Sequence, residues 1–285
     1  MELYLTTKNS FKFLGISFSK YSGSGNDFIL IDNRKSFFPV DKIKIIQDLC
    51  QRRNGIGADG IILLQNSVSA DFRMRIFNAD GSEAEMCGNG IRCLIKFLLE
   101  LGFKEGPWYI ETMERKLFCK LAGDQVSINM GEPTDFSFNL PLSIDGQLNT
   151  VHVLNTGVPH AVIFVEDEEE ISIDKTGAMI RYHEHFRPKG VNASFACVRP
   201  SGKVFQRTYE RGVEGETLAC GTGATAVAIA AAKVKKLQPP ILVRTRSGSE
   251  LKIDFKLDGD NIRDVSMTGD AQLVYQGQVE ISKTL

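Results

Sequence analysis

Two short segments of the chain repeat each other. Residues 83–90 read EAEMCGNG and residues 216–223 read ETLACGTG, so a Glu, a Cys and two Gly residues recur at the same places, 133 residues apart. Each segment follows a strand-like stretch, RMRIFNADG in the first case and FQRTYERG in the second. Each also leads into a strongly helical stretch, 91–101 or 224–236. A duplicated strand–loop–helix unit predicts two similar halves.

The repeated loop places a cysteine, Cys87 or Cys220, before a glycine-rich helix start. The N-terminus of a helix presents backbone N–H groups without helical acceptors and a partial positive charge. This field is expected to lower the pKa of a thiol and to bind a substrate carboxylate against the bare glycine backbone. Two such loops facing each other would place one thiol on each side of a carboxylate-bearing molecule. The arrangement predicts proton removal from one face of an α-carbon and proton return to the other, with no metal or organic cofactor.

Composition excludes several classes of protein. The 285 residues carry 34 Lys and Arg against 35 Asp and Glu, and this balance offers no basic surface for nucleic acid or an anionic membrane. The longest apolar run, 224–232, is far shorter than a membrane span. Six cysteines in a chain of this length are too few for a disulfide scaffold. We expect a cytoplasmic enzyme with reduced thiols and a small-molecule substrate; the oligomeric state stays open, with a homodimer as one candidate.

Periodicity predicts short strands and a few helices. A helix is expected over 41–53 with Asp41 as its N-cap, and Gly131-Glu132-Pro133 is the expected domain boundary. The expected strands are Phe28–Asp32, Ile61–Gln65, Phe72–Phe77, Val126–Met130, Ala161–Val165 and Leu251–Phe255.

The segments around both cysteines resemble those of a known family. NADGSEAEMCGNGIRC (78–93) and YERGVEGETLACGTGA (209–224) are similar to the diaminopimelate epimerase family. The resemblance continues in SGSGNDFILID (22–32), RRNGIGADGII (52–62), NTGVPHAV (155–162) and MTGDAQLVYQG (267–277). These matches run in order along nearly the whole chain.

The resemblance implies a fold and an activity. The fold is α/β (α+β), with two pseudo-symmetric halves, each a curved mixed β-sheet wrapped around a central helix, and the active site in the cleft between them. The halves are expected at 1–130 with 270–285, and at 131–269. The implied reaction interconverts LL- and meso-diaminopimelate without pyridoxal phosphate, in lysine and peptidoglycan precursor synthesis.

The resemblance also implies roles for individual residues. Cys87 and Cys220 match the two acid/base thiols, and His160 and Glu210 match the groups that set their protonation. The positions that match substrate contacts are Asn26, Asn78, Gly88, Asn89, Asn192, Arg211, Gly221 and Thr222.

Three features depart from the family pattern. Val158 stands where the family usually has an Asn that holds the distal end of the substrate, which favours looser selectivity. One extra residue lies between Glu210 and Cys220, and it either moves Glu210 or bulges the loop outward. The residues before Lys20 extend beyond the usual start and are interpreted as a short appendage.

The remaining chemistry-bearing residues have simpler interpretations. Cys50, Cys93, Cys119 and Cys197 are expected to be buried small side chains. The acidic run 166–170 is expected to be a solvated surface segment. His183 and His185 lack a third ligand and are not expected to bind a metal.

Other functions stay open as alternatives. The first is a related two-cysteine amino-acid racemase, either proline-racemase-like or acting also on a smaller acidic amino acid. A redox centre is disfavoured because the chain has no Cys-x-x-Cys. A non-catalytic binding protein is the third class.

Overall fold

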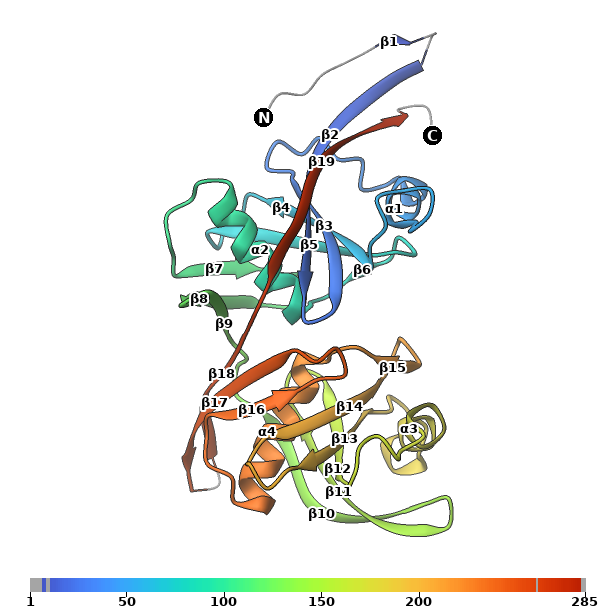
Figure 1. Cartoon of the computed structure of the whole chain (residues 1–285), viewed down its shortest axis with the longest axis vertical. Coiled ribbons are helices and arrows are strands. Elements are labelled where there is room, and N and C mark those ends of the chain that lie inside the picture. The colour runs from blue at the N-terminus through green and yellow to red at the C-terminus, as the bar shows by residue number, and fades with distance from the viewer. Residues whose placement is uncertain (1–6, 9–10, 260, 283–285) are drawn as a thin grey trace. The chain divides into compact units, whose positions relative to one another are not determined.

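The computed structural model describes residues 7–8, 11–259 and 261–282. The chain forms two compact units (Figure 1). Unit 1 comprises the described residues up to Val126 together with those from Asp270 onward, and unit 2 comprises Ser127–Gly269. Strand β9 (Gln125–Asn129) crosses the boundary between them.

Unit 1 is built on a mixed sheet. Its strands run in the spatial order β19-β2-β3-β4-β5-β7-β8, with β3 parallel to β4 and β5 parallel to β7. The short strand β1 (Thr7–Lys8) pairs with the start of β2, and β6 forms a hairpin with β5. The elements are β2 (Phe11–Gly23), β3 (Asn26–Asp32), α1 (Ile43–Cys50), β4 (Gly60–Gln65), β5 (Phe72–Asn78), β6 (Glu83–Ala84), α2 (Gly88–Glu100), β7 (Trp108–Glu111), β8 (Lys116–Ala122) and β19 (Gln272–Ser282).

Unit 2 repeats this plan. Its strands run β10-β11-β12-β13-β14-β16-β17-β18, again with two parallel pairs, β12 with β13 and β14 with β16. The elements are β10 (Thr134–Ile144), β11 (Gln147–Asn155), β12 (Pro159–Phe164), α3 (Ile173–Arg181), a 3₁₀ turn (Glu184–Phe186), β13 (Asn192–Val198), β14 (Val204–Glu210), β15 (Gly215–Thr217), α4 (Gly221–Lys235), β16 (Ile241–Arg244), β17 (Glu250–Asp258) and β18 (Asn261–Gly269).

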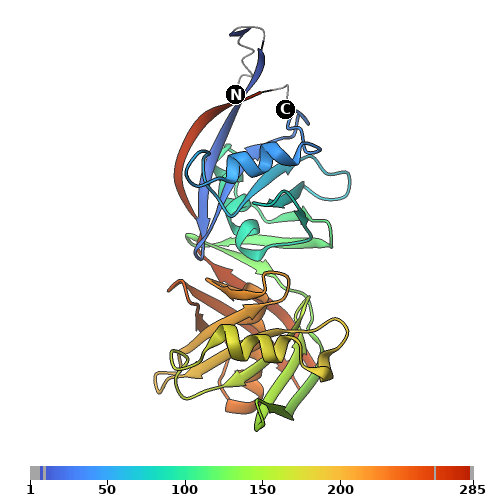
Figure 2. The same cartoon turned by 90° about the vertical axis from the view of Figure 1, so that its right-hand side faces the viewer.

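Each unit buries both faces of its sheet. In unit 1, alternate residues of β4 point to opposite sides. Ile61 and Leu63 join the core cluster that includes Ile46 of α1, whereas Ile62 lies against Gly90 of α2. In unit 2, α3 packs on one face, where Gly177 lies against the Tyr209 ring, and α4 covers the other. Figure 2 shows α1 and α3 each lying across the outer face of its own sheet. The central helices, α2 and α4, are therefore the ones that carry the repeated cysteine loops.

Most sequence-based expectations for the elements are confirmed. All six expected strands form, with bounds shifted by one to three residues. The two strongest helices also form, but each begins three residues earlier than expected, at Gly88 and Gly221. The glycines after each cysteine are thus the first turn of the helix rather than a loop before it.

The expectation for the first helix was wrong at both ends. It spans only Ile43–Cys50, and its N-cap is Lys42 without a side-chain cap hydrogen bond, not Asp41. The helix ends early because Gln51 is extended, and the carbonyls of Leu49 and Cys50 accept hydrogen bonds from Gly57 and Ala58 instead of from a further helical turn.

The interpretation of the N-terminal residues as an appendage was wrong for the described part. Residues 11–19 form the first part of β2, which pairs with β19 along its length. Leu14, Ile16 and Phe18 are buried in the core of unit 1. Residues 1–6 and 9–10 lie outside the described residues.

Two further expectations concern surfaces. Within the described part of the chain, no helix is both long and apolar enough to cross a membrane. The expectation of a solvated acidic run is confirmed for Glu166, Glu169 and Glu170, which are exposed. It was wrong for Glu168, which is buried and ion-paired with Arg199.

Candidate active site

Cys220 caps the central helix of unit 2. Its backbone is extended, and its sulfur accepts a hydrogen bond from the N–H of Gly223 at 3.4 Å. A Cβ atom at Gly223 would lie 2.6 Å from Gln206 Nε2 and 3.1 Å from the Cys220 sulfur. Gly223, the second glycine of CGTG, is therefore required because Gln206 lies too close for a side chain. The Cys220 thiol lies at the N-terminus of α4, the positive end of the helix dipole.

Glu210 and Cys220 form a buried pair. The thiol hydrogen-bonds to the Glu210 carboxylate, which also accepts a hydrogen bond from the hydroxyl of Thr217 at 2.5 Å. Burial raises the pKa of the Cys220 thiol well above its ordinary value, and the charge of Glu210 raises it further. The hydrogen bonds from Thr222 and Gly223 lower it but do not compensate. The expected lowering of the thiol pKa by the helix terminus was therefore wrong at Cys220, which keeps its proton.

His160 lies on the other side of the same helix start. Its Nε2 is 3.0 Å from the Thr222 hydroxyl, and that hydroxyl is 3.5 Å from the Cys220 sulfur. Burial, with a smaller effect of the Arg211 charge, lowers the pKa of His160 to about 3. Its Nδ1 is a buried atom without a hydrogen-bond partner among the described residues. The ring is thus neutral at physiological pH.

Asn192 and Arg211 are neighbours in unit 2. The Asn192 side chain accepts a hydrogen bond from the backbone N–H of Arg211 at 2.7 Å and donates one to the Pro159 carbonyl at 3.3 Å. Asn192 is opposite His160 in the β12–β13 register. Unit 2 therefore gathers His160, Asn192, Arg211 and Glu210 around the N-terminus of α4.

The extra residue between Glu210 and Cys220 bulges outward. Glu210 pairs with Gly215 across the β14–β15 hairpin, and the intervening turn, 211–214, has Glu214 at a φ of +57°. Val213 at its tip is 62% exposed. Because the insertion is absorbed in an exposed turn, Glu210 keeps its contact with the thiol.

Cys87 has the same local geometry in unit 1. The sulfur of this partly exposed cysteine accepts a hydrogen bond from the N–H of Gly90 at 3.5 Å, and its backbone is extended like that of Cys220. A Cβ atom at Gly90 would lie 2.9 Å from Ile62 Cδ1. Both cysteines of the repeat are thus thiol N-caps.

A chain of amides extends from this helix start. Asn89 donates to the Asn26 side-chain oxygen at 2.7 Å, and Asn26 donates to the Asp59 carboxylate at 3.0 Å. Arg52 binds Asp59 at 2.6 Å and also binds Asp27. The Asp59–Arg52 pair therefore orients Asn26.

Arg92 anchors the same helix turn from within the core. The side chain is fully buried, and its guanidinium donates to the Asn89 side-chain oxygen at 2.8 Å, the Ser24 hydroxyl at 2.6 Å and the Asp270 carbonyl at 3.0 Å. Burial lowers the pKa of Arg92. The buried cation fixes Asn89 and hence Asn26.

Asn78 lies at the end of β5. Its side chain donates to the Ser82 hydroxyl at 3.0 Å, and it pairs with Gly60 across the β4–β5 register. A Cβ at Gly60 would lie 2.4 Å from the Phe77 carbonyl oxygen, so this strand position requires glycine.

The four remaining cysteines are buried, as expected. The cysteines at positions 50, 93, 119 and 197 are all buried and free. His183 uses both ring nitrogens, one with the Ser143 carbonyl and the other with the backbone N–H of His185. Among the residues that the structure describes, no group of three His, Cys, Asp or Glu side chains is suited to a metal ion.

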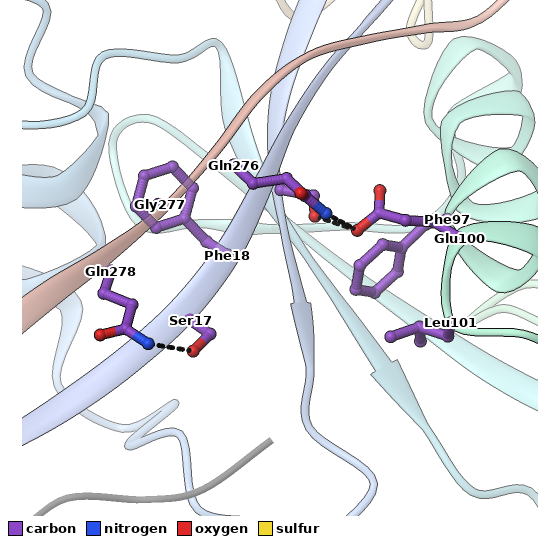
Figure 3. A pocket seen from close by; sticks show the side chains of 9 residues that line it. Ser17, Phe18, Phe97, Glu100, Leu101, Gln276, Gly277 and Gln278 are labelled. Carbon is purple, nitrogen blue, oxygen red and sulfur yellow. Dashed lines mark hydrogen bonds between the residues drawn. The ribbon is translucent and has the colours of Figure 1, made fainter.

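A separate hollow of about 360 Å³ in unit 1 lies between β2, β19 and the end of α2 (Figure 3). Glu100 accepts hydrogen bonds there from Ser19 and from Gln276. Phe18 and Phe97 line it as well. None of the site residues expected from the sequence is among its lining residues, so we assign it no part in the site.

Several residues that organise the two cysteine loops could not be recognised from the sequence. Arg92 and Asp59 lie inside the segments that carry the family resemblance, but only their contacts reveal their roles. The repeated motif includes Glu83 and Glu216. The arginines that pair with them, Arg75 and Arg207, lie outside it.

The chain is similar to known proteins over nearly its whole length. The family model for diaminopimelate epimerase matches residues 18–135 and 152–274. A diaminopimelate epimerase of Aquifex aeolicus is 41% identical over 278 residues, covering 93% of this chain and 98% of that protein. One of Synechocystis is 40% identical, covering 94% and 100%, and one of Methanocella arvoryzae is 39% identical, covering 93% and 97%.

Solved structures share the fold at low sequence identity. A phenazine biosynthesis protein of the PhzF family from Bacillus anthracis superposes with a TM-score of 0.73 at 16% identity, covering 94% of this chain and 99% of that one. A hydroxyproline epimerase from Agrobacterium vitis gives a TM-score of 0.68 at 16% identity, covering 94% and 93%. The family model and the relatives of about 40% identity show that the chain, with its two cysteine-capped helices, belongs to the diaminopimelate epimerase family.

Proposed function

We propose that the protein interconverts LL- and meso-diaminopimelate by two-cysteine proton transfer at the α-carbon. The observation that carries the proposal is the duplicated helix start, in which Cys87 and Cys220 each cap a helix with their own sulfur. Family membership and relatives about 40% identical, all named diaminopimelate epimerase, support the substrate.

In the proposed reaction, Cys87 as thiolate removes the α-proton, and the electron pair of the C–H bond delocalises into the carboxylate. The Cys220 thiol then delivers its proton to the opposite face, which inverts the centre and leaves Cys220 as thiolate. The first-turn N–H groups of α2 and α4, at Gly88, Asn89, Gly221 and Thr222, stabilise the negative charge that develops on the carboxylate. No cofactor takes part in this scheme, because the two cysteine sulfurs carry the removed and the returned proton and the helix N–H groups stabilise the charge on the carboxylate.

The environment of Cys220 supports its role as the acid in this direction. Its raised pKa keeps the thiol protonated. In the reverse direction Cys220 must be a thiolate that removes the α-proton, and the hydrogen-bonded Glu210 carboxylate is proposed to take the thiol proton of Cys220 beforehand. His160, which stays neutral, is proposed to influence the protonation of Cys220 through the Thr222 hydroxyl that lies between the ring and the sulfur. Asn26, Asn78, Asn192 and Arg211 are proposed to bind the polar groups of the substrate.

The test is incubation of the reduced protein with LL-diaminopimelate in deuterated water without added cofactor. Chiral chromatography follows the meso product, and mass spectrometry follows α-deuterium. We expect inversion with deuterium incorporation, abolished in Cys87→Ala and in Cys220→Ala. Full activity in either variant would contradict the two-thiol mechanism.

A second candidate function is a related racemase of broader or different specificity. The partly buried Val158, in the turn before β12, has no side chain to hydrogen-bond a distal substrate group. If diaminopimelate is not inverted but deuterium enters glutamate, aspartate or proline, this alternative replaces the first. Inversion of diaminopimelate with no exchange into these amino acids would remove it.

Location and assembly complete the proposal. Six cysteines in a chain of 285 residues are too few for a disulfide scaffold, which supports a cytoplasmic location with reduced thiols. Leu273, Val274 and Tyr275 follow one another at a bulge of β19 and are 46%, 58% and 43% exposed, which supports a homodimer through this strand of unit 1. Light scattering is expected to give twice the 31.6 kDa chain mass, and a monomer mass at micromolar concentration would refute the dimer.

A further inference from the structure

The glutamate of each repeat forms the same ion pair. Glu83 receives two hydrogen bonds of 2.7 Å from Nε and Nη2 of Arg75. Glu216 receives two hydrogen bonds, also of 2.7 Å, from the same two nitrogens of Arg207. Both pairs are bidentate, the geometry that fixes a carboxylate most strongly. Nothing in the proposed reaction uses either pair.

Each pair bridges the hairpin that precedes a thiol. In unit 1, Glu83 is opposite Phe77 across β5–β6, so Arg75 reaches it diagonally from two residues along the strand. In unit 2, Glu216 is opposite Tyr209 across β14–β15, and Arg207 reaches it by the same diagonal. The turn between the two strands is one residue longer in unit 2 than in unit 1, yet the Arg–Glu pair has the same geometry in both. The pair, rather than the turn, is therefore the shared constraint on the segment that enters each cysteine loop.

In unit 2 the pair is linked to the reactive groups by a short path. Glu216 is followed by Thr217, whose hydroxyl donates to the Glu210 carboxylate. Glu210 in turn hydrogen-bonds to the Cys220 thiol. A shift of Glu216 along the hairpin would therefore move Thr217 and loosen the Glu210–Cys220 contact.

We propose that Arg75–Glu83 and Arg207–Glu216 are twin positioning clamps, each of which holds the thiol of its own unit in place for the epimerisation under Proposed function. Reacting groups must be held within a fraction of an ångström, and a displacement of about 1 Å costs up to about a hundredfold in rate. Each clamp acts through the hairpin and does not itself contact the reacting atoms.

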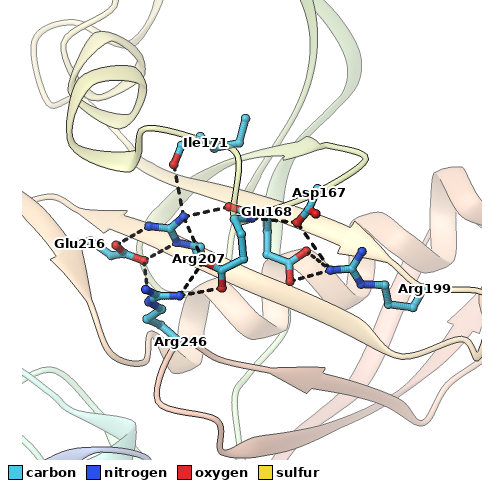
Figure 4. A network of polar contacts seen from close by, with 8 residues as sticks. Asp167, Glu168, Ile171, Arg199, Arg207, Glu216 and Arg246 are labelled. Carbon is cyan, nitrogen blue, oxygen red and sulfur yellow. Dashed lines mark hydrogen bonds and ion pairs between the residues drawn. The ribbon is translucent and has the colours of Figure 1, made fainter.

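The acidic run reinforces the second clamp (Figure 4). The remaining Arg207 nitrogen, Nη1, donates to the Glu168 carbonyl at 2.9 Å and to the Ile171 carbonyl at 3.2 Å. Arg246 binds Glu169 at 2.6 Å and lies 3.9 Å from Glu216. In unit 1, by contrast, Arg75 packs over the Phe77 ring at 5.0 Å. The backbone carbonyls of Glu168, in the acidic run, and of Ile171, just after it, therefore help to orient the Arg207 guanidinium.

The clamps are tested by the alkylation of the two cysteines with iodoacetamide, followed residue by residue by peptide mass spectrometry. The measurement needs no substrate. In Glu216→Gln we expect the rate at Cys220 to change at least fivefold while the rate at Cys87 stays within twofold. In Glu83→Gln we expect the reverse. Glu250→Gln, which removes the exposed Lys203–Glu250 pair of unit 2, is the control and should leave both rates within twofold.

Turnover provides the second readout. Each Gln variant is expected to lose about 10- to 100-fold in kcat while KM changes less than threefold, because the clamps position thiols rather than bind substrate. Glu83→Asp keeps the charge and shortens the reach, and it should recover part of the lost kcat. If a Gln variant fails to fold, Arg75→Lys and Arg207→Lys, which keep the charge but lose the bidentate geometry, are measured in its place.

The outcomes separate the two proposals. Equal changes at both cysteines in either variant, or no change at either cysteine, would overturn the clamps. If the unmodified protein inverts diaminopimelate but the Gln variants show no selective change in alkylation, the clamps alone are overturned. Selective changes in a protein that does not invert diaminopimelate support the clamps and overturn the substrate assignment.

Discussion

The Cys220 sulfur lies 3.4 Å from the Gly223 amide nitrogen and accepts its hydrogen bond. The same relationship holds between Cys87 and Gly90 at 3.5 Å. A sulfur in this position takes the place of the Ser or Asp oxygen that ordinarily caps a helix. The group proposed to transfer protons is therefore also the group that starts the helix, and chemistry and local structure depend on the same atom.

Replacing Gly223 with Ala should disturb this cap. The new Cβ would lie 2.6 Å from Gln206 Nε2 and 3.2 Å from the Ser194 hydroxyl, so these buried groups must shift. We expect a loss of about 1–3 kcal/mol in the free energy of unfolding and a fall in kcat of at least tenfold. Urea unfolding and turnover measure the two effects. Gly215→Ala is the control, since a Cβ there meets open space; a loss as large in the control would show that the close approach at Gly223 is not the cause.

The thiol pKa of Cys220 should respond to Glu210. Burial raises that pKa first, and the charge of Glu210 raises it further. Glu210→Gln removes the charge, so the pKa of Cys220 should fall and the thiolate fraction at pH 8–9 should rise. Alkylation at Cys220 should therefore become faster, although turnover is lost. Thr217→Ser, which keeps the hydroxyl bonded to Glu210, should leave the alkylation profile in place. A slower reaction in Glu210→Gln would contradict the electrostatic explanation.

His160 should make the stability of the protein depend on pH. Its pKa is about 3 in the folded state and close to 6.5 in the unfolded chain, so only the unfolded state binds a proton between these values. Stability should therefore fall as the pH is lowered from 6.5 toward 3, by up to about 1.4 kcal/mol per pH unit from this group.

His160→Gln should flatten this dependence, which urea midpoints at pH 5 and pH 8 would reveal. Thr222→Val is the control, because it removes the hydroxyl that faces the ring but keeps the titratable imidazole. An unchanged slope in His160→Gln would mean that other groups carry the pH dependence.

Arg92→Met should be strongly destabilising. The variant leaves the buried oxygens of Asn89, Ser24 and Asp270 without their donor. We expect a loss of about 2–4 kcal/mol in the free energy of unfolding, together with a raised KM because Asn89 and Asn26 lose their orientation. Arg263→Met is the control on the surface, where its 3.9 Å contact with Asp258 is exposed, and it should change stability by less than about 0.5 kcal/mol. A KM equal to that of the unmodified protein would show that Asn26 is oriented without Arg92.

Local signals in the chain were sufficient for much of the fold. Alternating apolar residues predicted the strands, and the central helices followed from runs such as 224–232. The periodicity could not show where α1 ends, because the chain folds back after Gln51 and Gly57 and Ala58 donate to the last carbonyls of the helix. It also could not show that residues 11–19 belong to the sheet, since their partner, β19, lies at the other end of the chain.

The sequence by itself determined that two cysteine loops of one design exist and that each begins a helix, because the Cys-Gly-x-Gly pattern and the helical run after it are local. Only the tertiary structure decided how each thiol is positioned and whether the Cys220 thiol keeps its proton. Burial beside Glu210 keeps Cys220 protonated against the field of its helix, and arginines from neighbouring strands fix the glutamate of each repeat. These effects depend on desolvation and on contacts between segments, which no local pattern encodes.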